Sequence, residues 1–200
     1  VTAALRRLFD VVVAGAALVL ASPLLLAAML AVRLESPGGV IYRQRRVGRG
    51  GHEFDVLKLR TMVDGADDQK AALRVISEQD GPAFKLRNDP RITPFGAFLR
   101  RTSLDEFPQF MNILRGDMSL VGTRPPTLDE VEKYRLGDRR RLSIRPGLTG
   151  LWQVSGRNEI QDFDDVIKLD LRYIDHWSIW MDLWIVFRTV GVALFRKGAY

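Results

Sequence analysis

The chain has 200 residues, with 30 Lys plus Arg against 24 Asp plus Glu and a formal net charge of +6. This length suffices for one domain with its own core and is too short for two. The absence of cysteine excludes a disulfide framework and a thiolate zinc site, and the basic balance suits a nucleic acid, an anionic bilayer surface or a phosphorylated substrate equally well.

The first predicted element is an apolar segment of membrane length. Val11 to Val32 carries no charged residue, and as a helix it would be roughly 33 Å long, enough to cross a hydrocarbon core. A cleaved signal peptide is the first alternative, but the apolar run is longer than the core of a usual signal sequence. The segment is therefore predicted to lie in a bilayer.

Ser22 and Pro23 at the centre of this segment predict a kink. Proline removes a backbone hydrogen bond and bends a helix, while the serine hydroxyl can bond the carbonyl that is released. Basic residues flank both ends, which places both ends on the cytoplasmic face by the positive-inside rule. We predict a re-entrant membrane helical hairpin over residues 1–36, with a simple membrane span as the alternative.

Residues 37–200 are predicted to form a mostly helical α+β domain around a small β-hairpin. Residues 40–62 alternate apolar and polar side chains on both sides of a Gly-Arg-Gly-Gly turn, a pattern typical of paired strands. Lys58 and Arg60 on the second arm point to the same side, where they are either solvated or bind phosphate.

The next stretch connects the hairpin to the most distinctive motif. Residues 65–79 are predicted to form a polar amphipathic helix, and residues 80–95, rich in Gly, Pro, Asn and Asp, a lid-like loop or a plain connector. Thr93 and Pro94 then predict the start of a short helix with proline at its first position, leading to Arg100.

Residues 100–126, RRTSLDEFPQFMNILRGDMSLVGTRPP, are the part around which the rest is predicted to be arranged. Ser103 is predicted to be the N-cap of a helix whose free N–H groups keep a nearby carboxylate ionised. Asp105 and Glu106 would point about 100° apart on that helix, so they suit two different roles. One can attack an electrophile while the other holds a divalent cation, and the flanking arginines neutralise a phosphate-rich substrate.

A capping box is the alternative interpretation of Ser103-x-x-Glu106, because the glutamate can simply bond back to the cap residue. The same pattern recurs at Thr127-x-x-Glu130, where it opens a predicted ordinary helix over residues 127–141. What favours chemistry at the first copy is its surroundings of Arg, Pro, Gln and Gly: Arg100, Arg101, Pro108, Gln109, Gly122 and Arg124.

Two features follow the central motif. Residues 143–158, SIRPGLTGLWQVSGRN, have glycines and a proline that predict tight turns bringing Arg145, Gln153 and Arg157 near a ligand, with a surface loop as the alternative. Residues 162–174 are predicted to be helical.

The last predicted element, residues 178–195, combines tryptophans and aliphatic residues with two charges. Asp182 and Arg188 argue against crossing a membrane, while Trp180 and Trp184 favour the membrane interface. We predict an amphipathic interfacial helix, with a core helix of a soluble domain as the alternative.

Together these motifs resemble the monotopic phosphoglycosyl transferases of bacteria, which start capsule, exopolysaccharide and O-antigen assembly. Four motifs carry the resemblance in order: Ser22-Pro23, FDVLKLRTM at residues 54–62, residues 100–124, and RPGLTGLWQVSGRN at residues 145–158. The resemblance covers nearly the whole chain. Thr123 departs from it, since many members have proline there, and this affects local loop shape.

The resemblance implies a two-step transfer. Asp105 would attack the β-phosphate of a UDP-sugar, expel UMP and carry the sugar-phosphate, which a polyprenyl (undecaprenyl) phosphate would then accept. Glu106 would bind Mg²⁺. The implied phosphate or nucleotide contacts are Lys58, Arg60, Arg100, Arg124, Arg145, Gln153 and Arg157.

The resemblance also implies a setting: the cytoplasmic face of the bacterial inner membrane, a lipid bilayer as partner, no nucleic acid, and homo-oligomer formation as an open expectation. Glucose or galactose is the expected sugar, and further membrane helices and another domain are expected to precede this part in the longer family members. Two other classes stay open: a basic membrane-anchored binding module without chemistry, and a glycosidase or lipid phosphatase that uses the same carboxylates.

Overall fold

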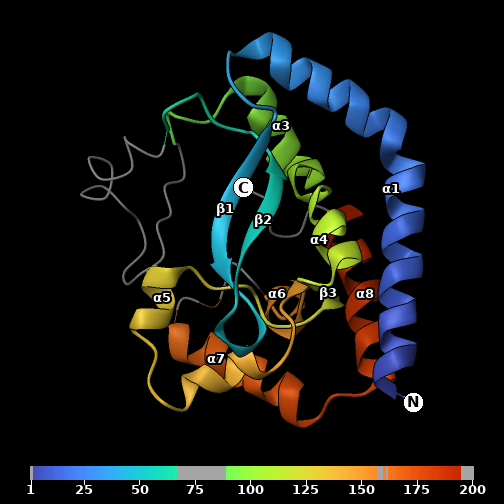
Figure 1. Cartoon of the computed structure of the whole chain (residues 1–200), viewed down its shortest axis with the longest axis vertical. Helices are drawn as coiled ribbons and strands as arrows, with labels where there is room; N and C mark the ends of the chain where they lie inside the picture. The colour runs from blue at the N-terminus through green and yellow to red at the C-terminus, as the bar shows by residue number, and fades with distance from the viewer. Residues whose placement is uncertain (1, 67–88, 157–159, 161, 195–200) are drawn as a thin grey trace.

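The computed structural model describes residues 2–66, 89–156, 160 and 162–194. Figure 1 shows a long helix along one side of the molecule, with a β-hairpin and shorter helices beside it. In chain order the elements are α1 (Thr2–Glu35), β1 (Ile41–Val47), η1 (Arg49–Gly51), β2 (Glu53–Leu59), α3 (Pro94–Thr102), η3 (Leu104–Glu106), α4 (Gln109–Arg115), β3 (Ser119–Val121), α5 (Leu128–Glu132), η4 (Asp138–Ser143), β4 (Gly147–Thr149), α6 (Leu151–Val154), α7 (Phe163–Asp175) and α8 (Ile179–Leu194). The predicted mostly helical α+β class is confirmed for these residues.

α1 is a single bent helix, not two antiparallel helices joined by a turn. Figure 1 shows it rising along one edge of the molecule and then turning over the top. Pro23 lacks the N–H that would bond the Val19 carbonyl, and the Ser22 hydroxyl donates to that oxygen at 2.8 Å. The two predicted kink residues therefore act as expected, while re-entry into a bilayer stays a prediction.

The middle of α1 is apolar and unburied. On either side of it, Ala14 packs in one hydrophobic cluster and Ala28 and Val32 pack in another. Between them Val19 and Leu20 are 72% and 81% exposed. Among the described residues, α1 is the one helix long and apolar enough to cross a membrane, and only 11% of its most apolar window is buried. Such a surface suits contact with lipid rather than with water.

Two short sheets position the candidate residues. β1 and β2 pair antiparallel from Ile41 opposite Leu59 to Val47 opposite Glu53, which confirms the predicted hairpin. β3 and β4 pair in parallel and bring the segment after residue 121 beside residues 145–150. The approach requires glycine, because a Cβ on Gly147 would lie 2.1 Å from the backbone nitrogen of Gly122.

The main core collects side chains from nearly every part of the described chain. Its buried members are Ala14, Val56, Ile113, Met118, Leu120, Val121, Leu151, Val154, Tyr173 and Ile185. A smaller cluster packs the second half of α1 against Leu59 of β2 and Leu99 of α3. The hairpin thus lies between both clusters, which fixes it relative to α3 and α4.

The helix predictions have mixed outcomes. The short helix predicted at Thr93 is α3, and the Thr93 hydroxyl accepts a hydrogen bond from Gly96 N at 2.9 Å. α7 and α8 confirm the helices predicted over 162–174 and 178–195. The helix predicted over 127–141 is wrong in length, because α5 ends at Glu132. The helix predicted over 65–79 lies almost entirely outside the described residues, as does most of the loop predicted over 80–95.

Candidate active site

Asp105 and Glu106 lie in η3, a single 3-10 turn between α3 and α4. Ser103 occupies the N-cap position of this short turn but does not cap it with its side chain, which corrects the prediction. Its φ is 56°, in the left-handed region, and its N–H donates to the carbonyls of Leu99 and Arg100 at the end of α3. The Ser103 side chain makes no capping bond, so the alternative of a capping box is also wrong here. The acidic pair therefore follows a helix end and does not begin a long helix.

The hairpin supplies a cation to this turn. Lys58 on β2 lies 3.0 Å, Nζ to Oε1, from Glu106, and both side chains are 29% exposed. The two residues are 48 positions apart in the chain, so the contact depends on the packing of β2 against η3. The structure therefore places Lys58 beside the acidic pair, and its predicted role as a phosphate contact stays a prediction.

Asp105 is a buried carboxylate. Its residue is 7% exposed, and burial raises its pKa from 3.8 to about 6, partly offset by the positive charges of Lys58 and Arg100, while Glu106 raises it further. The carboxylate is thus mainly ionised at neutral pH, as predicted. The cause of this ionisation differs from the prediction: the nearby cations favour the charged carboxylate against the effect of burial, and no helix N-terminus is involved.

Arg100 reaches the same site from the last turn of α3. Its Nε donates to the Thr61 hydroxyl, which lies just after β2, at 2.9 Å. Burial lowers the pKa of Arg100, and the charges of Asp105 and Asp89 counter this. Asp89 itself pairs with Arg91, 2.6 Å from Oδ2 to Nη2, with both side chains 4% exposed. Thr61 and the Asp89–Arg91 pair are partners that the sequence interpretation missed.

Asn112 is another residue beside the site that the sequence interpretation missed. It is fully buried on α4, its Oδ1 accepts from Leu57 N at 3.0 Å, and its Nδ2 donates to Asp55 O at 2.8 Å. These bonds fix the strand that carries Lys58 against the helix that follows Glu106. A polar amide within the apolar run QFMNILR is the signal that could have revealed it, since buried amides require partners.

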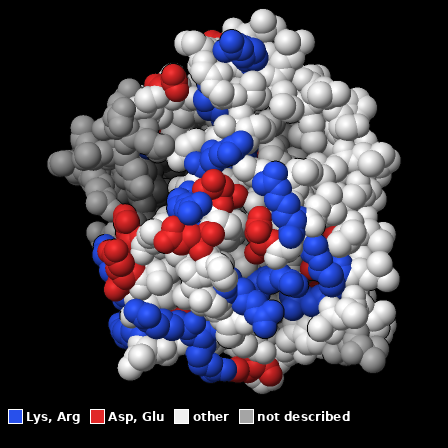
Figure 2. All heavy atoms as spheres, viewed as in Figure 1, with Lys and Arg blue, Asp and Glu red and all other residues white. Residues whose placement is uncertain are grey.

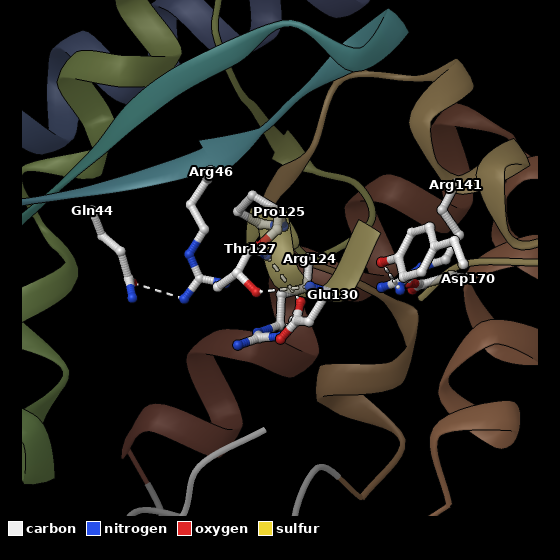
Figure 3. A network of polar contacts seen from close by, with 9 residues as sticks. Gln44, Arg46, Arg124, Pro125, Thr127, Glu130, Arg141 and Asp170 are labelled. Carbon is white, nitrogen blue, oxygen red and sulfur yellow. Dashed lines mark hydrogen bonds and ion pairs between the residues drawn. The ribbon is translucent and has the colours of Figure 1, made fainter. Parts of the chain in front are cut away.

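Arg124 lies in a second polar group, drawn in Figure 3. Its Nη1 is 3.2 Å from Oε1 of Glu130, and Arg46 of β1 donates to Pro125 O at 3.0 Å. Burial lowers the pKa of Arg46 to about 10, and the charge of Arg124 lowers it further. Glu130 also completes the capping box with Thr127, which confirms that predicted box. Arg124 thus pairs directly with Glu130, while Arg46 bonds a backbone carbonyl and is influenced by Glu130 only through its charge.

The remaining predicted contacts lie in other places. Arg60 is buried, and its guanidinium donates to the carbonyls of Ser36 and Pro37 just after α1, at 2.7 Å each. Arg145 lines a separate cavity, described below. Gln153 lies on α6, and Arg157 falls outside the described residues. The structure thus brings Lys58, Arg100, Asp105 and Glu106 together and does not gather the full predicted set.

The donor set at the acidic turn matches one kind of metal site. Among the described residues no group of three or more acidic or histidine side chains gathers, which does not suit a structural metal. Mg²⁺ is commonly bound by one or two carboxylates plus substrate phosphates. Asp105 and Glu106 supply two adjacent carboxylates, and within the described chain Asp105 has no ion pair, so the residues fit Mg²⁺ bound with a phosphate substrate.

Charge on the viewed surface is unevenly distributed. Figure 2 shows acidic and basic side chains interleaved in the middle of this face, and a dense group of Lys and Arg below them, beside the tip of the hairpin. A surface with a dense basic group suits a partner or substrate that carries several negative charges.

The fold therefore combines an acidic pair near Lys58 and Arg100 with one helix that, within the described residues, is long and apolar enough to cross a membrane. The chain belongs to the bacterial sugar transferase family, whose model matches residues 1–196.

Curated relatives support the family. The chain is 52% identical over 176 residues to the galactosyl transferase CpsE of Streptococcus agalactiae serotype III, covering 88% of this chain and 39% of that protein. It is 45% identical to the undecaprenyl-phosphate galactose phosphotransferase of Salmonella typhimurium, covering 98% and 42%. It is 44% identical to the exopolysaccharide production protein ExoY of Rhizobium meliloti, covering 98% and 88%. The chain thus spans about two fifths of the first two relatives and most of the third.

Proposed function

We propose that this chain transfers a hexose-1-phosphate, glucose or galactose, from a UDP-sugar to polyprenyl phosphate and releases UMP, as the first membrane step of exopolysaccharide, capsule or O-antigen synthesis. The observation that carries the proposal is Asp105, a buried carboxylate flanked by Lys58 and Arg100. The names of the relatives, which include a phosphotransferase acting on undecaprenyl phosphate, support the substrate class.

In the first step an Asp105 carboxylate oxygen bonds the β-phosphorus of the donor. The bond from that phosphorus to the bridging oxygen breaks, and its electron pair leaves with UMP. Burial favours this role, because a weakly solvated carboxylate is more basic and more nucleophilic than one in water. Lys58 and Arg100 offset the repulsion between the carboxylate and the diphosphate, which in a low dielectric amounts to several kcal/mol.

In the second step a phosphate oxygen of the polyprenyl phosphate bonds the same phosphorus and the Asp105 carboxylate leaves. Glu106 would hold Mg²⁺, which when bound supplies positive charge to the phosphate oxygens. Arg124, which pairs with Glu130, and Arg46, which bonds Pro125 O, would contact the nucleotide part of the donor.

The unburied apolar middle of α1 supports a bilayer location for this chemistry. A re-entrant helix at the cytoplasmic face of the bacterial inner membrane would hold the acidic turn at the headgroup level, where a soluble donor and a lipid acceptor meet. Exposed aromatic residues on α8, Trp180 and Trp184, suit the same interface.

The test is to treat the purified protein with UDP-glucose or UDP-galactose in Mg²⁺ without acceptor. We expect release of about one equivalent of UMP per chain, as for a covalent intermediate that accumulates, and a phosphosugar on Asp105 by peptide mass spectrometry. Added polyprenyl phosphate should discharge the adduct into a lipid-linked sugar. The Asp105→Asn variant is the control and should give neither product. Turnover with no adduct on Asp105 would refute the covalent mechanism.

A further inference from the structure

A second basic region surrounds a cavity of about 240 Å³ that is separate from the acidic turn. Four arginines from three distant segments line it: Arg6 and Arg7 on α1, Arg49 at the tip of the hairpin, and Arg145 before β4. The cavity has none of Lys58, Arg100, Asp105 or Glu106 in its lining.

The hairpin register separates the two regions. Lys58 is paired with Tyr42, and the strands end at Val47 opposite Glu53. From Lys58 to Glu53, where the tip begins, the strand advances by five residues, a distance of roughly 17 Å along the chain. A phosphate at the tip is too far away to be the one that Asp105 attacks.

Two of the four arginines have structural partners. Arg6 lies 3.2 Å, Nε to Oδ2, from Asp182 of α8, and it donates to the Tyr173 hydroxyl at 2.7 Å. Arg7 donates to the carbonyls at the end of α4, Ile113 O at 2.6 Å and Leu114 O at 2.8 Å. These bonds hold the first turns of α1 against α4 and α8, so Arg6 and Arg7 are explained by the fold.

Arg49 and Arg145 are different. Within the described ranges the structure records no hydrogen bond or ion pair for either guanidinium. One acidic residue, Asp10, also lines the cavity, but it is 3% exposed and its oxygens accept from the Ser119 hydroxyl at 2.7 Å and from Leu120 N at 3.0 Å. The cavity therefore keeps an excess of positive charge, with two guanidiniums that the fold does not use.

The chemistry and size of the cavity indicate a phosphate group. Planar guanidinium groups match phosphate oxygens in pairs of hydrogen bonds. The volume is below the roughly 300–1,000 Å³ of sites that enclose a drug-sized ligand, so it suits a phosphate with its immediate substituents and not a whole nucleotide-sugar. Trp177 also lines the cavity, and Leu5 and Leu8 nearby on α1 are 58% and 60% exposed, so the cavity lies beside apolar surface that suits lipid.

We infer that Arg49 and Arg145 bind a phosphate group in this cavity, at a site distinct from the acidic turn. The group comes either from the headgroup of an anionic phospholipid or from soluble phosphate, and both sources present the same chemistry. In the first case the site would fix the height and orientation of the domain on the bilayer.

The experiment measures how fast phenylglyoxal modifies individual arginines, read by peptide mass spectrometry, and it uses the Asp105→Asn protein so that turnover plays no part. One arm adds inorganic phosphate to detergent-solubilised protein. The other compares nanodiscs of phosphatidylcholine alone with nanodiscs that also contain phosphatidylglycerol, in phosphate-free buffer. At about ten times the dissociation constant, we expect modification of Arg49 and Arg145 to slow roughly tenfold.

Arg43 and Arg139, exposed arginines outside the cavity lining, are the matched controls, and their rates should change less than twofold. Protection by phosphate alone or by phosphatidylglycerol alone supports the site and identifies its source. As a second measurement, the double variant Arg49→Gln, Arg145→Gln should bind one phosphate fewer per chain by calorimetry than the parent, while Arg43→Gln, Arg139→Gln binds as many as the parent. No protection in either arm, or equal protection of Arg43 and Arg139, would overturn the inference. Either result leaves the adduct test on Asp105 unaffected.

Discussion

Asp105 and Asp170 are both buried aspartates whose pKa is raised by burial, yet they differ in whether a cation is bonded to the carboxylate. Asp170, on α7, is 1% exposed and receives the Arg141 guanidinium through Nε at 2.8 Å and Nη2 at 2.6 Å. Arg141 also donates to the Tyr134 hydroxyl at 2.6 Å (Figure 3). The charge of Asp170 is thus paired directly and completely within the fold.

Asp105 has cations near it but not bonded to it. Lys58 is paired with Glu106, and Arg100 donates to Thr61, so both act on the Asp105 carboxylate through space and form no ion pair with it within the described residues. The comparison teaches that burial alone does not identify a reactive carboxylate. What distinguishes Asp105 from Asp170 is burial without a direct ion pair among the described residues, a state that costs stability and that a substrate and a cation can relieve.

The largest expected effect is at the paired aspartate. Asp170→Asn should lower the free energy of unfolding by about 3–5 kcal/mol, because it leaves the Arg141 guanidinium buried and uncompensated. Chemical denaturation measures this. The control is Asp175→Asn, which removes a surface partner of Arg140 and should change stability by about 1 kcal/mol or less. A similar loss in both variants would show that the buried pair has no special role.

At the active site, a substitution is expected to change the free energy of unfolding in the opposite direction. Asp105→Asn should raise the free energy of unfolding by on the order of 2 kcal/mol at pH 7.5, because the folded state disfavours the ionised carboxylate. Because the pKa of Asp105 is raised from 3.8 to about 6 on folding, its ionisation lowers the free energy of unfolding by the full amount above about pH 6 and by nothing below pH 3.8. The difference between the variant and the parent should therefore shrink as the pH falls from 6 to 4. A constant difference would mean that another effect of the substitution dominates.

The pH dependence of adduct formation sharpens the comparison further. The rate of the first half-reaction should fall roughly tenfold per pH unit, about 1.4 kcal/mol, below an apparent pKa near 6. The first half-reaction is the suitable one, because a phosphate monoester acceptor itself titrates near pH 6. Lys58→Met should raise the apparent pKa and Glu106→Gln should lower it, since those charges act on Asp105 in opposite directions. Shifts in the same direction would assign the titration to a different group.

The smallest expected effect compares the two Ser/Thr-x-x-Glu patterns. Thr127→Ala should cost about 1 kcal/mol of stability, because the Thr127 hydroxyl accepts from Glu130 N at 3.2 Å and the box is complete. Ser103→Ala should cost a few tenths of a kcal/mol at most, since the Ser103 side chain caps nothing. Thermal unfolding at equal pH measures both, and equal losses would contradict the structural distinction between them.

Local patterns predicted much of the fold. The hairpin, the Thr93 cap with Pro94 after it, the Ser22–Pro23 kink and the Thr127 box were all predictable, because each depends on residues a few positions apart. Ser103 has the same local pattern as Thr127 and a different outcome. Glu106 is paired with Lys58 from β2, a contact across 48 residues that no tetrapeptide can reveal.

The candidate site was predictable in part for the same reason. The adjacent carboxylates and the basic flanks are visible in the sequence, and Lys58 and Arg100 do lie with them. Three other arginines carry the same charge and lie elsewhere. Arg60 bonds the end of α1, Arg124 pairs with the Glu130 carboxylate, and Arg145 lines the second cavity. Composition and spacing cannot separate arginines that bind the fold from arginines that bind a ligand.

The sequence by itself determined an apolar kinked segment of membrane length, a paired acidic motif and a surplus of positive charge, since these are properties of neighbouring residues. Only the tertiary structure decided which cation meets which carboxylate and which carboxylate is buried without a direct partner. The physical reason is that charge interactions and desolvation depend on distance and burial in space, and folding brings together groups that lie far apart in the chain.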